Sequence, residues 1–240
     1  MPNTKLTPSL RRLLKSYRGK ASLRKQIAKA LFVSVLLTAL VGPFEPSDAA
    51  TVPKATQILA KLATKGRAPQ TGYDRDLFSD GWGDIGECDA RNYILKRDLT
   101  NITFRSSPRC TVGTGTLNDP YTGQVINFVR GVGTSSEVQI DHVVAVSDAW
   151  QKGAQKLSSS KRYSFYNDPL NLLAVDGPTN QQKSDSDAAS WLPPRRAYWC
   201  PYVARQIAVK YKYNLWVTSA ERASMVRVLK TCPNQVIPKG

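Results

Sequence analysis

The sequence contains one histidine, His142, among 240 residues, and its four cysteines lie far apart without any C-x-x-C pair. Structural zinc sites usually combine closely spaced cysteines with histidines. The pattern therefore argues against a zinc site. Any reaction of this protein that requires an imidazole has to use His142.

The sequence also lacks an apolar run long enough to span a bilayer, which takes about 20 residues. Residues 30–41, ALFVSVLLTALV, are apolar over only twelve positions. A basic segment precedes this run and the small residues of SDAA follow it, an order typical of an export signal cleaved after Ala49 or Ala50. We expect residues 1–50 to be a signal peptide and the mature protein to be secreted, with no stable membrane insertion. A retained amphipathic anchor is the alternative.

Acidic side chains are scarce as well, since 18 Asp and Glu stand against 34 Lys and Arg and give a net charge of +16. Without residues 1–50 the counts are 16 and 25, and the net charge is +9. Such an excess suits a polyanionic partner such as nucleic acid. Solubility or adsorption to a cell wall explains the same charge. The remaining residues, about 190, are enough for one compact domain.

All four cysteines, Cys88, Cys110, Cys200 and Cys232, follow the expected signal peptide. An even number of cysteines in an exported protein indicates disulfide bonds. Four cysteines allow three different pairings. We favour Cys88 with Cys110 and Cys200 with Cys232, because each bond then closes a local loop within one half of the chain.

The domain organisation is simple, since the sequence shows no repeat and no low-complexity tract. Residues 51–72 contain one short amphipathic helix and a linker. Residues 73–240 are expected to form a single domain. Its first part, 73–117, mixes loops with one expected helix at 90–97, and NDPYTGQVINFVRG then predicts a turn followed by a strand.

The middle of this domain is predicted to run in the order strand, excursion, strand, helix. The strands are EVQIDHVVAV and LNLLAV, whose β-branched and apolar residues favour extended structure. Between them, Ser147 is expected to cap a helix, and SSSKRYSFYND is expected to be a polar loop. Asp176 and Pro178 predict the start of a helix that runs to about Ala189.

Two further helices are predicted near the C-terminal end. YWCPYVARQIAVKYKYNL has the helical pattern, and TSAE at 218–221 is a capping box for a final helix that ends near Cys232. Several basic residues of this region are expected to face solvent, where they can line a nucleic-acid surface. They are Arg205, Lys210, Lys212, Arg222 and Arg227.

His142 follows Asp141 in the first predicted strand of the middle region. The unperturbed pKa of imidazole is about 6.5, so at neutral pH the ring is mostly a free base that can take a proton from water. The neighbouring carboxylate points to the other side of the strand, where it can hold a cation. The Asp-His pair alone fits a packed structural histidine equally well.

Separated blocks around this pair carry a resemblance to a known family. They are IDHVVAVSDAWQKGA, NDPLNLLAVDGPTNQQKSD, WLPP and YWCPYVARQIAVKYKYNLWVT, with DRDLF, GECDARNYILKRDL and DPYTG upstream. From about Tyr73 to Cys232 the sequence resembles the HNH, or ββα-metal, nucleases. More narrowly, it is similar to exported bacterial HNH proteins related to the C-terminal domain of GmrSD-type restriction endonucleases. The resemblance implies an α+β fold with a ββα-metal core and flanking helices, which the two disulfides would staple.

The resemblance also implies roles for individual residues. His142 would be the general base that activates water, and Asp141 would be a ligand of a single divalent cation. Asn171 would hold the histidine loop through a backbone contact. Asn180 would be the second metal ligand, where the literal HNH pattern has a histidine. A site of oxygen ligands favours Mg2+, with Mn2+ as the second choice.

Two basic residues are expected to contact substrate phosphate. Lys183 lies one helical turn after Asn180, so that both project from one face; the alternative is an exposed salt bridge to Asp187. Arg91 is expected to pack against the site and contact phosphate. The alternative for Arg91 is an ordinary position on the surface of its helix.

These features together predict a secreted, monomeric endonuclease that hydrolyses phosphodiester bonds of DNA, with RNA left open as a second substrate. The sequence shows no base-reading module, so little sequence specificity is expected. Binding would depend on phosphate contacts and weaken with salt. One alternative is a non-catalytic cationic protein that binds nucleic acid or the cell wall on a decayed nuclease fold. The other is a defence nuclease that acts on modified DNA, which the export signal disfavours.

Overall fold

The computed structural model describes residues 52–105 and 109–239. The expected signal peptide, residues 1–50, lies outside the described residues. From Val52 onward the chain forms one unit. Within 52–105 and 109–239, no helix is both long and apolar enough to cross a membrane.

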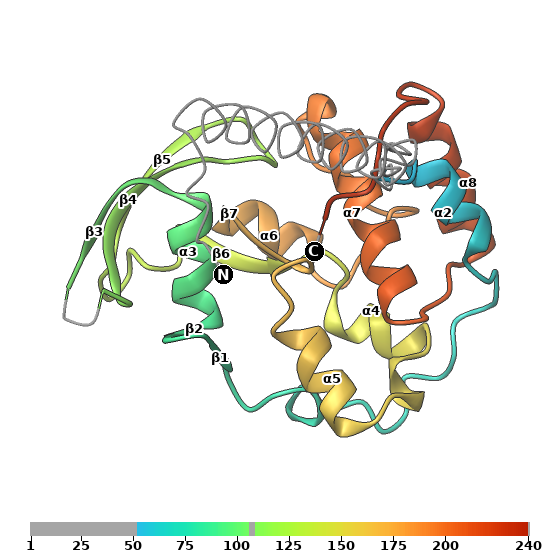
Figure 1. The fold of residues 1–240 in the computed structure, drawn as a ribbon, viewed down its shortest axis with the longest axis horizontal. Helices are drawn as coiled ribbons and strands as arrows, with labels where there is room; N and C mark the ends of the chain where they lie inside the picture. The colour runs from blue at the N-terminus through green and yellow to red at the C-terminus, as the bar shows by residue number, and fades with distance from the viewer. Residues whose placement is uncertain (1–51, 106–108, 240) are drawn as a thin grey trace, which may run out of the picture. The chain divides into compact units, whose positions relative to one another are not determined.

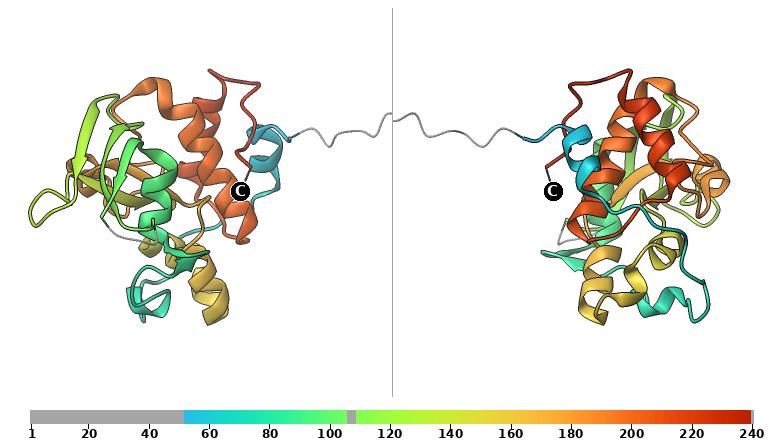
Figure 2. Two further views of the ribbon diagram at one scale, coloured as in Figure 1. Left: turned by 60° about the vertical axis from the view of Figure 1, so that its left-hand side comes forward. Right: turned by 90° about the vertical axis from the view of Figure 1, so that its right-hand side faces the viewer.

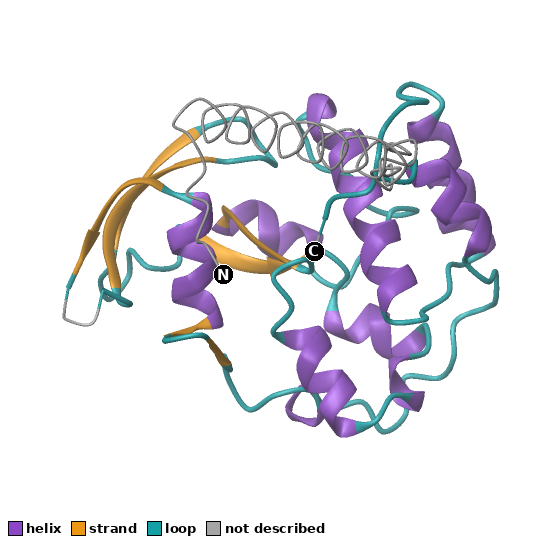
Figure 3. Cartoon of the chain, in the orientation of Figure 1, coloured by secondary structure: helices purple, strands orange, loops and turns teal. Residues whose placement is uncertain are grey.

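The fold mixes helices with antiparallel strands (Figures 1 and 3). In the described residues, β1 (Asp84–Ile85) pairs with β2 (Cys88–Asp89), β4 (Val112–Asn118) lies between β3 (Thr100–Phe104) and β5 (Val125–Val129), and β6 (Val138–His142) pairs with β7 (Leu172–Asp176). The α-helices are α2 (Ala55–Lys61), α3 (Ala90–Asp98), α4 (Val146–Gln151), α5 (Ser159–Tyr166), α6 (Gly177–Lys183), α7 (Trp199–Lys212) and α8 (Ser219–Leu229). Short 3-10 turns are η1 (Arg75–Leu77), η2 (Ala154–Lys156) and η3 (Arg196–Tyr198).

The antiparallel pair of β6 and β7 and the helix that follows it place His142 in the fold. His142 lies opposite Leu172 at one end of the pair, and Val138 lies opposite Asp176 at the other. Asp176 ends β7 and caps α6, since its side chain accepts a hydrogen bond from the backbone N of Thr179 at 2.8 Å. The predicted order of strand, excursion, strand and helix is confirmed, and so is the capping residue.

The predicted end of this helix is wrong. α6 ends at Lys183 rather than near Ala189. The reason is the backbone of Ser184, whose φ of 49° lies in the left-handed region and interrupts a right-handed helix. Residues 184–189 therefore form a loop after α6.

The excursion between β6 and β7 also differs from the prediction. α4 begins at Val146, so Ser147 lies inside the helix and does not cap it. The stretch predicted as a polar loop contains α5, which Ser158 caps by accepting a hydrogen bond from a backbone N–H. Only Phe165 and Tyr166 of α5 are buried. With so few apolar positions the helical period is weak in the sequence, and tertiary packing supplies the stability.

Strands β3 and β4 lie where the sequence predicts loops. β4, VGTGTLN, contains two glycines and two threonines, and its pairing with β5 runs from Thr114 opposite Val129 to Asn118 opposite Val125. Gly115 leaves room for Leu99 there, because a Cβ would lie 2.7 Å from that side chain and would have to displace it. Such a strand is stabilised by its neighbours rather than by its own propensity. The predicted α3 and β5 are confirmed.

α7 carries much of the core, with α2 and α8 beside it (Figures 1 and 2). One part of its surface, including Tyr202, Val203 and Ile207, is buried in a cluster with α2 and α8. Ala208 and Val209 belong to a second cluster with α4 and α5. A third cluster lies between α3 and strands β4 to β7. The two helices predicted near the C-terminal end are confirmed.

A group of charged side chains is buried between α4, α7 and α8. The Nζ of Lys152 lies 2.6 Å from Asp148, 2.6 Å from Asp187 and 2.7 Å from Glu221. The Nζ of Lys210 lies 3.2 Å from Asp148 and 2.9 Å from Glu221. The prediction that Lys210 faces solvent is wrong, because its side chain is fully buried. Burial acts to lower the pKa of Lys210, but the two carboxylates raise it overall, so the ammonium stays charged.

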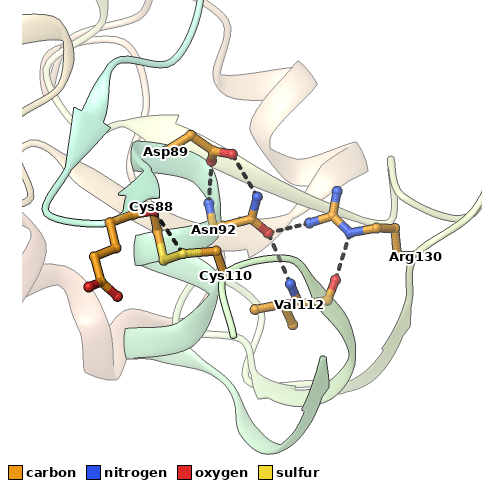
Figure 4. The surroundings of a disulfide bond; sticks show 7 residues. Cys88, Asp89, Asn92, Cys110, Val112 and Arg130 are labelled. Atoms are coloured by element: carbon orange, nitrogen blue, oxygen red, sulfur yellow. Dashed lines mark hydrogen bonds between the residues drawn. A yellow bond between two sulfur atoms is a disulfide. The ribbon is translucent and has the colours of Figure 1, made fainter. Parts of the chain in front are cut away.

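Two disulfides, Cys88–Cys110 and Cys200–Cys232, are formed as predicted. The first joins β2 to the segment before β4, and Asn92 lies beside it (Figure 4). The side-chain oxygen of Asn92 accepts hydrogen bonds from the backbone N of Val112 at 3.1 Å and from Arg130 at 2.6 Å. The second disulfide joins the first turn of α7 to the chain just after α8.

Replacing Cys200 and Cys232 together by serine is expected to lower the free energy of unfolding by about 2–5 kcal/mol. The bond spans a sequence separation of 32 residues, so its loss frees a loop of that length in the unfolded chain. Urea unfolding monitored by circular dichroism measures the change. A double variant with the midpoint of the parent protein would contradict the expectation.

Candidate functional site

A pocket of about 270 Å³ lies at the end of β6. Four parts of the chain line it: η1 with Arg75, β6 with Asp141 and His142, the start of α4 with Ser147, and α6 and its end with Asn180 and Asp185. The structure therefore brings together three of the residues that the sequence singles out, Asp141, His142 and Asn180. Arg75 and Asp185 are additional.

The imidazole of His142 is buried and held on two sides. Its ring stacks on Trp82, with 5.6 Å between ring centroids and 10° between planes. Its Nε2 lies 2.8 Å from the backbone oxygen of Tyr166. A carbonyl oxygen only accepts hydrogen bonds, so Nε2 carries the proton of the neutral ring. Nδ1 then keeps the lone pair and is the basic atom.

The surroundings of His142 keep the ring neutral at pH 7. Burial lowers the pKa of His142 to about 3, and the positive charge of Arg75 acts in the same direction. The hydrogen bond to Tyr166 opposes this shift, and Lys183 adds a smaller lowering effect. The ring is thus neutral at pH 7 and able to accept a proton, and it is a weaker base than a group whose pKa lies near that pH.

Asn171 holds the loop that follows His142. Its side-chain oxygen accepts a hydrogen bond from the backbone N of Val144 at 2.8 Å, and its side-chain nitrogen donates to the oxygen of Val144 at 3.3 Å. The backbone N of Val143 also donates to the oxygen of Asn171 at 2.8 Å. These contacts are of the kind that the resemblance implies for Asn171. They fix the backbone next to the imidazole.

The carboxylate of Asp141 accepts hydrogen bonds from two donors, one at each oxygen. Lys183 Nζ donates to Oδ1 at 2.8 Å, and the hydroxyl of Tyr121 donates to Oδ2 at 2.5 Å. Burial and the nearby charge of Asp141 raise the pKa of Tyr121, so its phenol stays protonated and remains a donor. Asp141 reaches the pocket with both oxygens already oriented.

Lys183 itself does not line the pocket. It is fully buried and also donates to the backbone oxygen of His142 at 3.0 Å. The alternative prediction, an exposed salt bridge to Asp187, is wrong because Asp187 pairs with Lys152 and Arg67. The ammonium of Lys183 forms an ion pair with Asp141 and a hydrogen bond with the backbone of His142, so it connects both residues to α6.

Asn180 presents its side-chain oxygen without a hydrogen-bond partner among the described residues. Its Nδ2 donates to the side chain of Gln139 at 2.9 Å, which orients the amide. Asn180 Oδ1 and the carboxylate of Asp141 are therefore protein oxygens that suit a hard cation, and the carboxylate of Asp185 lines the same pocket. In residues 52–105 and 109–239 no group of three or more His, Cys, Asp or Glu side chains is placed to hold a metal. The donor set fits an ion such as Mg2+, which keeps several waters and binds substrate phosphate.

Arg75 is a site residue that the sequence reasoning did not single out. Its Nε donates to the hydroxyl of Tyr166 at 3.2 Å, and its guanidinium lies 5.1 Å from the centroid of that ring. Among the described residues no carboxylate lies within 4.0 Å of it. The side chain is exposed at the pocket and available to an anion. The signal was its place in the block DRDLF, which the resemblance already included.

Arg91 lies elsewhere. Its guanidinium donates to the backbone oxygens of Ser135 at 3.1 Å and Val138 at 3.2 Å. It does not line the pocket. Burial lowers the pKa of Arg91, and the charge of Arg130 adds to that effect. The structure thus gives Arg91 a contact with the start of β6 and does not bring it to the other candidate residues.

Comparison with known protein families identifies a match over this region. The family described as GmrSD restriction endonucleases, C-terminal domain, matches residues 89–228. The chain belongs to this family. The matched range includes every candidate residue of the pocket except those contributed by η1 and the residues before it. This family membership makes the domain nuclease-like and nucleic acid its substrate class.

One curated relative is an uncharacterized secreted protein from Arthroderma benhamiae. The two sequences are 37% identical over 211 residues, which cover 85% of this chain and 100% of the relative. No solved structure matches the chain. The similarity to a secreted protein along its whole length, together with the two disulfides, identifies this GmrSD family member as a secreted protein.

Proposed function

We propose that the protein is a secreted, metal-dependent endonuclease that hydrolyses phosphodiester bonds of DNA as a monomer. In this proposal β6, β7 and α6 form a ββα-metal core of the HNH type. The observation that carries the proposal is the pocket that the imidazole of His142 shares with the oxygens of Asp141 and Asn180. Membership of a restriction endonuclease family supports the reaction class.

In the proposed mechanism, His142 Nδ1 accepts a proton from the water that attacks phosphorus. The hydrogen bond of Nε2 to Tyr166 and the stacking on Trp82 keep the ring in the required orientation. Asn171 fixes the adjacent backbone. Positioning of this kind supplies much of the rate enhancement of an enzyme.

Asp141 and Asn180 would hold the divalent cation, with Mg2+ favoured over Mn2+ by their oxygen ligands. When bound, such an ion polarises phosphoryl oxygens and stabilises the leaving 3′ oxygen. We assign Lys183 and Tyr121 to the orientation of the Asp141 carboxylate. This replaces the expectation that Lys183 contacts phosphate, since a fully buried ammonium already bound to a carboxylate is not available to substrate.

Incubation with supercoiled DNA, linear DNA and RNA tests the proposal. Nicking is expected with Mg2+ or Mn2+ and should be lost in EDTA, whereas Zn2+ should support less cleavage because the site offers no thiolate or second imidazole. Absence of cleavage with every metal, together with retained DNA binding, would support the non-catalytic alternative. Faster cleavage of modified than of unmodified DNA would instead support a defence nuclease.

Replacing Arg75 by alanine is expected to lower kcat/KM for DNA cleavage by about 10- to 100-fold, because a hydrogen bond to a charged group contributes about 1.5–3 kcal/mol. Arg75→Lys should recover only part of the rate, since lysine lacks the planar fork that binds phosphate. Arg109→Ala removes an exposed arginine outside the pocket and serves as the control. Equal kcat/KM for the Arg75 and Arg109 variants would exclude Arg75 from the site.

A further inference from the structure

We propose that a second pocket, outside the catalytic one, binds one nucleotide unit of single-stranded nucleic acid. This inference rests on the proposed function, because its ligand is the strand that the catalytic pocket would cut. The second pocket has a volume of about 300 Å³ and is formed by the end of α2, the turn η2 and the end of α7 with the residues after it. It shares no lining residue with the pocket of His142.

Positive charge is the first feature of this second pocket. Lys61, Lys65 and Lys156 line it, and none of its lining residues is Asp or Glu. Among the described residues no carboxylate lies within 4.0 Å of these three ammonium groups. Lys152 and Lys210, by contrast, are buried and have their charges compensated by ion pairs with Glu221. The charge of the three lining lysines is therefore uncompensated and suits phosphate groups.

Two aromatic rings are the second feature. Tyr211 is 47% exposed, and Lys61 Nζ lies 5.8 Å from its ring centroid. Lys65 Nζ lies 5.3 Å from the ring centroid of Trp216. Each ring thus has an ammonium group beside it, but Trp216 is only 9% exposed, so Tyr211 offers the accessible face. An aromatic face next to cations is the combination that binds bases and phosphates of single strands together.

The wall formed by Trp216 is held rigidly. Its indole N–H donates to the backbone oxygen of Gly66 at 2.9 Å. Gly153 lies directly against the ring, and a Cβ at that position would be 2.9 Å from it. The φ of Gly153 is 121°, which L side chains rarely adopt. The pocket is therefore built into the fold and does not depend on exposed side chains alone.

The volume of the second pocket limits the size of the ligand that it can bind. Ligand pockets usually measure about 300–1,000 Å³, so this one suits a single base with its phosphate rather than a duplex. A base that stacks on Tyr211 would leave its flanking phosphates near the three lysines. Stacking of this kind tolerates any base, because every base has a π face. The second pocket would add affinity for a strand without adding sequence specificity.

Fluorescence anisotropy of a labelled oligothymidylate, measured with the full-length protein in EDTA, tests the inference without any cleavage. Tyr211→Ala is expected to weaken binding about 5- to 100-fold through lost stacking. Tyr163→Ala, which removes a tyrosine that is 46% exposed but lies on α5 outside the pocket, should have little effect. Equal affinities of these two variants would overturn the proposal. Far-UV circular dichroism checks that both are folded.

Two further comparisons separate stacking from charge. On an abasic strand the loss caused by Tyr211→Ala should disappear, and its persistence would overturn the stacking role. Lys65→Ala with Lys156→Ala should reduce the slope of log K against log salt by about 1.4, or 0.7 for each phosphate contact. The control pair, Lys161→Ala with Lys230→Ala, changes exposed lysines elsewhere. Equal slopes for the two pairs would overturn the phosphate contacts.

Two further measurements distinguish a strand from a free nucleotide as the ligand, and separate this inference from the proposed nuclease function. Binding of thymidine monophosphate as tightly as the strand would overturn the assignment to a strand in favour of a free nucleotide. Loss of binding in Tyr211→Ala by a protein that cuts nothing with any metal would support this pocket and contradict the proposed nuclease. Normal nicking together with unchanged binding by Tyr211→Ala would support the proposed nuclease and contradict a nucleotide site in the second pocket.

Discussion

Replacing His142 by alanine is expected to lower the rate of metal-dependent plasmid nicking by about 10²- to 10⁴-fold, the usual contribution of a general base. The chain has no other histidine, so no neighbouring imidazole can take over. DNA affinity should change little, because the binding depends on phosphate contacts of basic residues. Nicking is measured by the conversion of supercoiled to relaxed DNA, and affinity by anisotropy in EDTA.

The buried position of His142 requires a control for folding. The ring stacks on Trp82 and bonds to the backbone of Tyr166, so alanine leaves a cavity. His142→Asn fills part of that space with an amide but supplies no base, and it should be as inactive as the alanine variant. Added imidazole should restore part of the rate of His142→Ala by occupying the cavity. Unchanged nicking by either variant would remove His142 from the mechanism.

Replacing Lys152 by alanine is expected to lower the free energy of unfolding by about 3–5 kcal/mol, the cost of leaving buried charges without their partner. Its ammonium is shared by Asp148, Asp187 and Glu221, all within 2.7 Å and all buried. Burial acts to raise the pKa of Asp187, but the hydrogen bond and charge of Lys152 lower it overall. This carboxylate therefore stabilises the fold above the ordinary aspartate pKa of about 3.9, and the contribution is lost as the pH falls through its lowered value.

Urea unfolding under oxidising conditions measures this loss. Lys161→Ala, an exposed lysine on α5, is the matched control and should change the free energy of unfolding by less than about 0.5 kcal/mol. Lys152→Met keeps the aliphatic volume and should be nearly as unstable as Lys152→Ala, because the missing charge is the cause. An alanine variant as stable as the control would show that the carboxylates do not depend on Lys152.

Local signals were sufficient for the starts of two helices, α6 and α8. Asp176 and Pro178 predicted the start of α6, and the capping box at 218–221 predicted the start of α8, because a helix cap depends on residues a few positions apart. The same locality explains the correct disulfide pairing, since each bond closes a short loop. α5 and β4 were missed because their residues have little preference for helix or strand, and long-range packing stabilises both elements.

Some residues of the candidate site were likewise predicted from the sequence, and others were not. Asp141, His142 and Asn180 were predicted from blocks of sequence, and the structure lines one pocket with them. The partner of Lys183 was not predictable from helical spacing, because Asp141 lies 42 residues away and reaches it only through the fold. Arg75 was missed because its place at the pocket depends on the packing of η1 against Tyr166 of α5. In the sequence only the block DRDLF pointed to it.

The order of strand, strand and helix, the favoured pairing of the four cysteines and the single imidazole next to a carboxylate follow from the sequence alone. The packed fold sets which imidazole nitrogen is basic, which donors orient Asp141 and which lysines are buried rather than exposed. The physical reason is that the chemistry of a polar group depends on its neighbours in space. For His142 these neighbours are Trp82 and Tyr166, which the chain brings to the ring only when its core is packed.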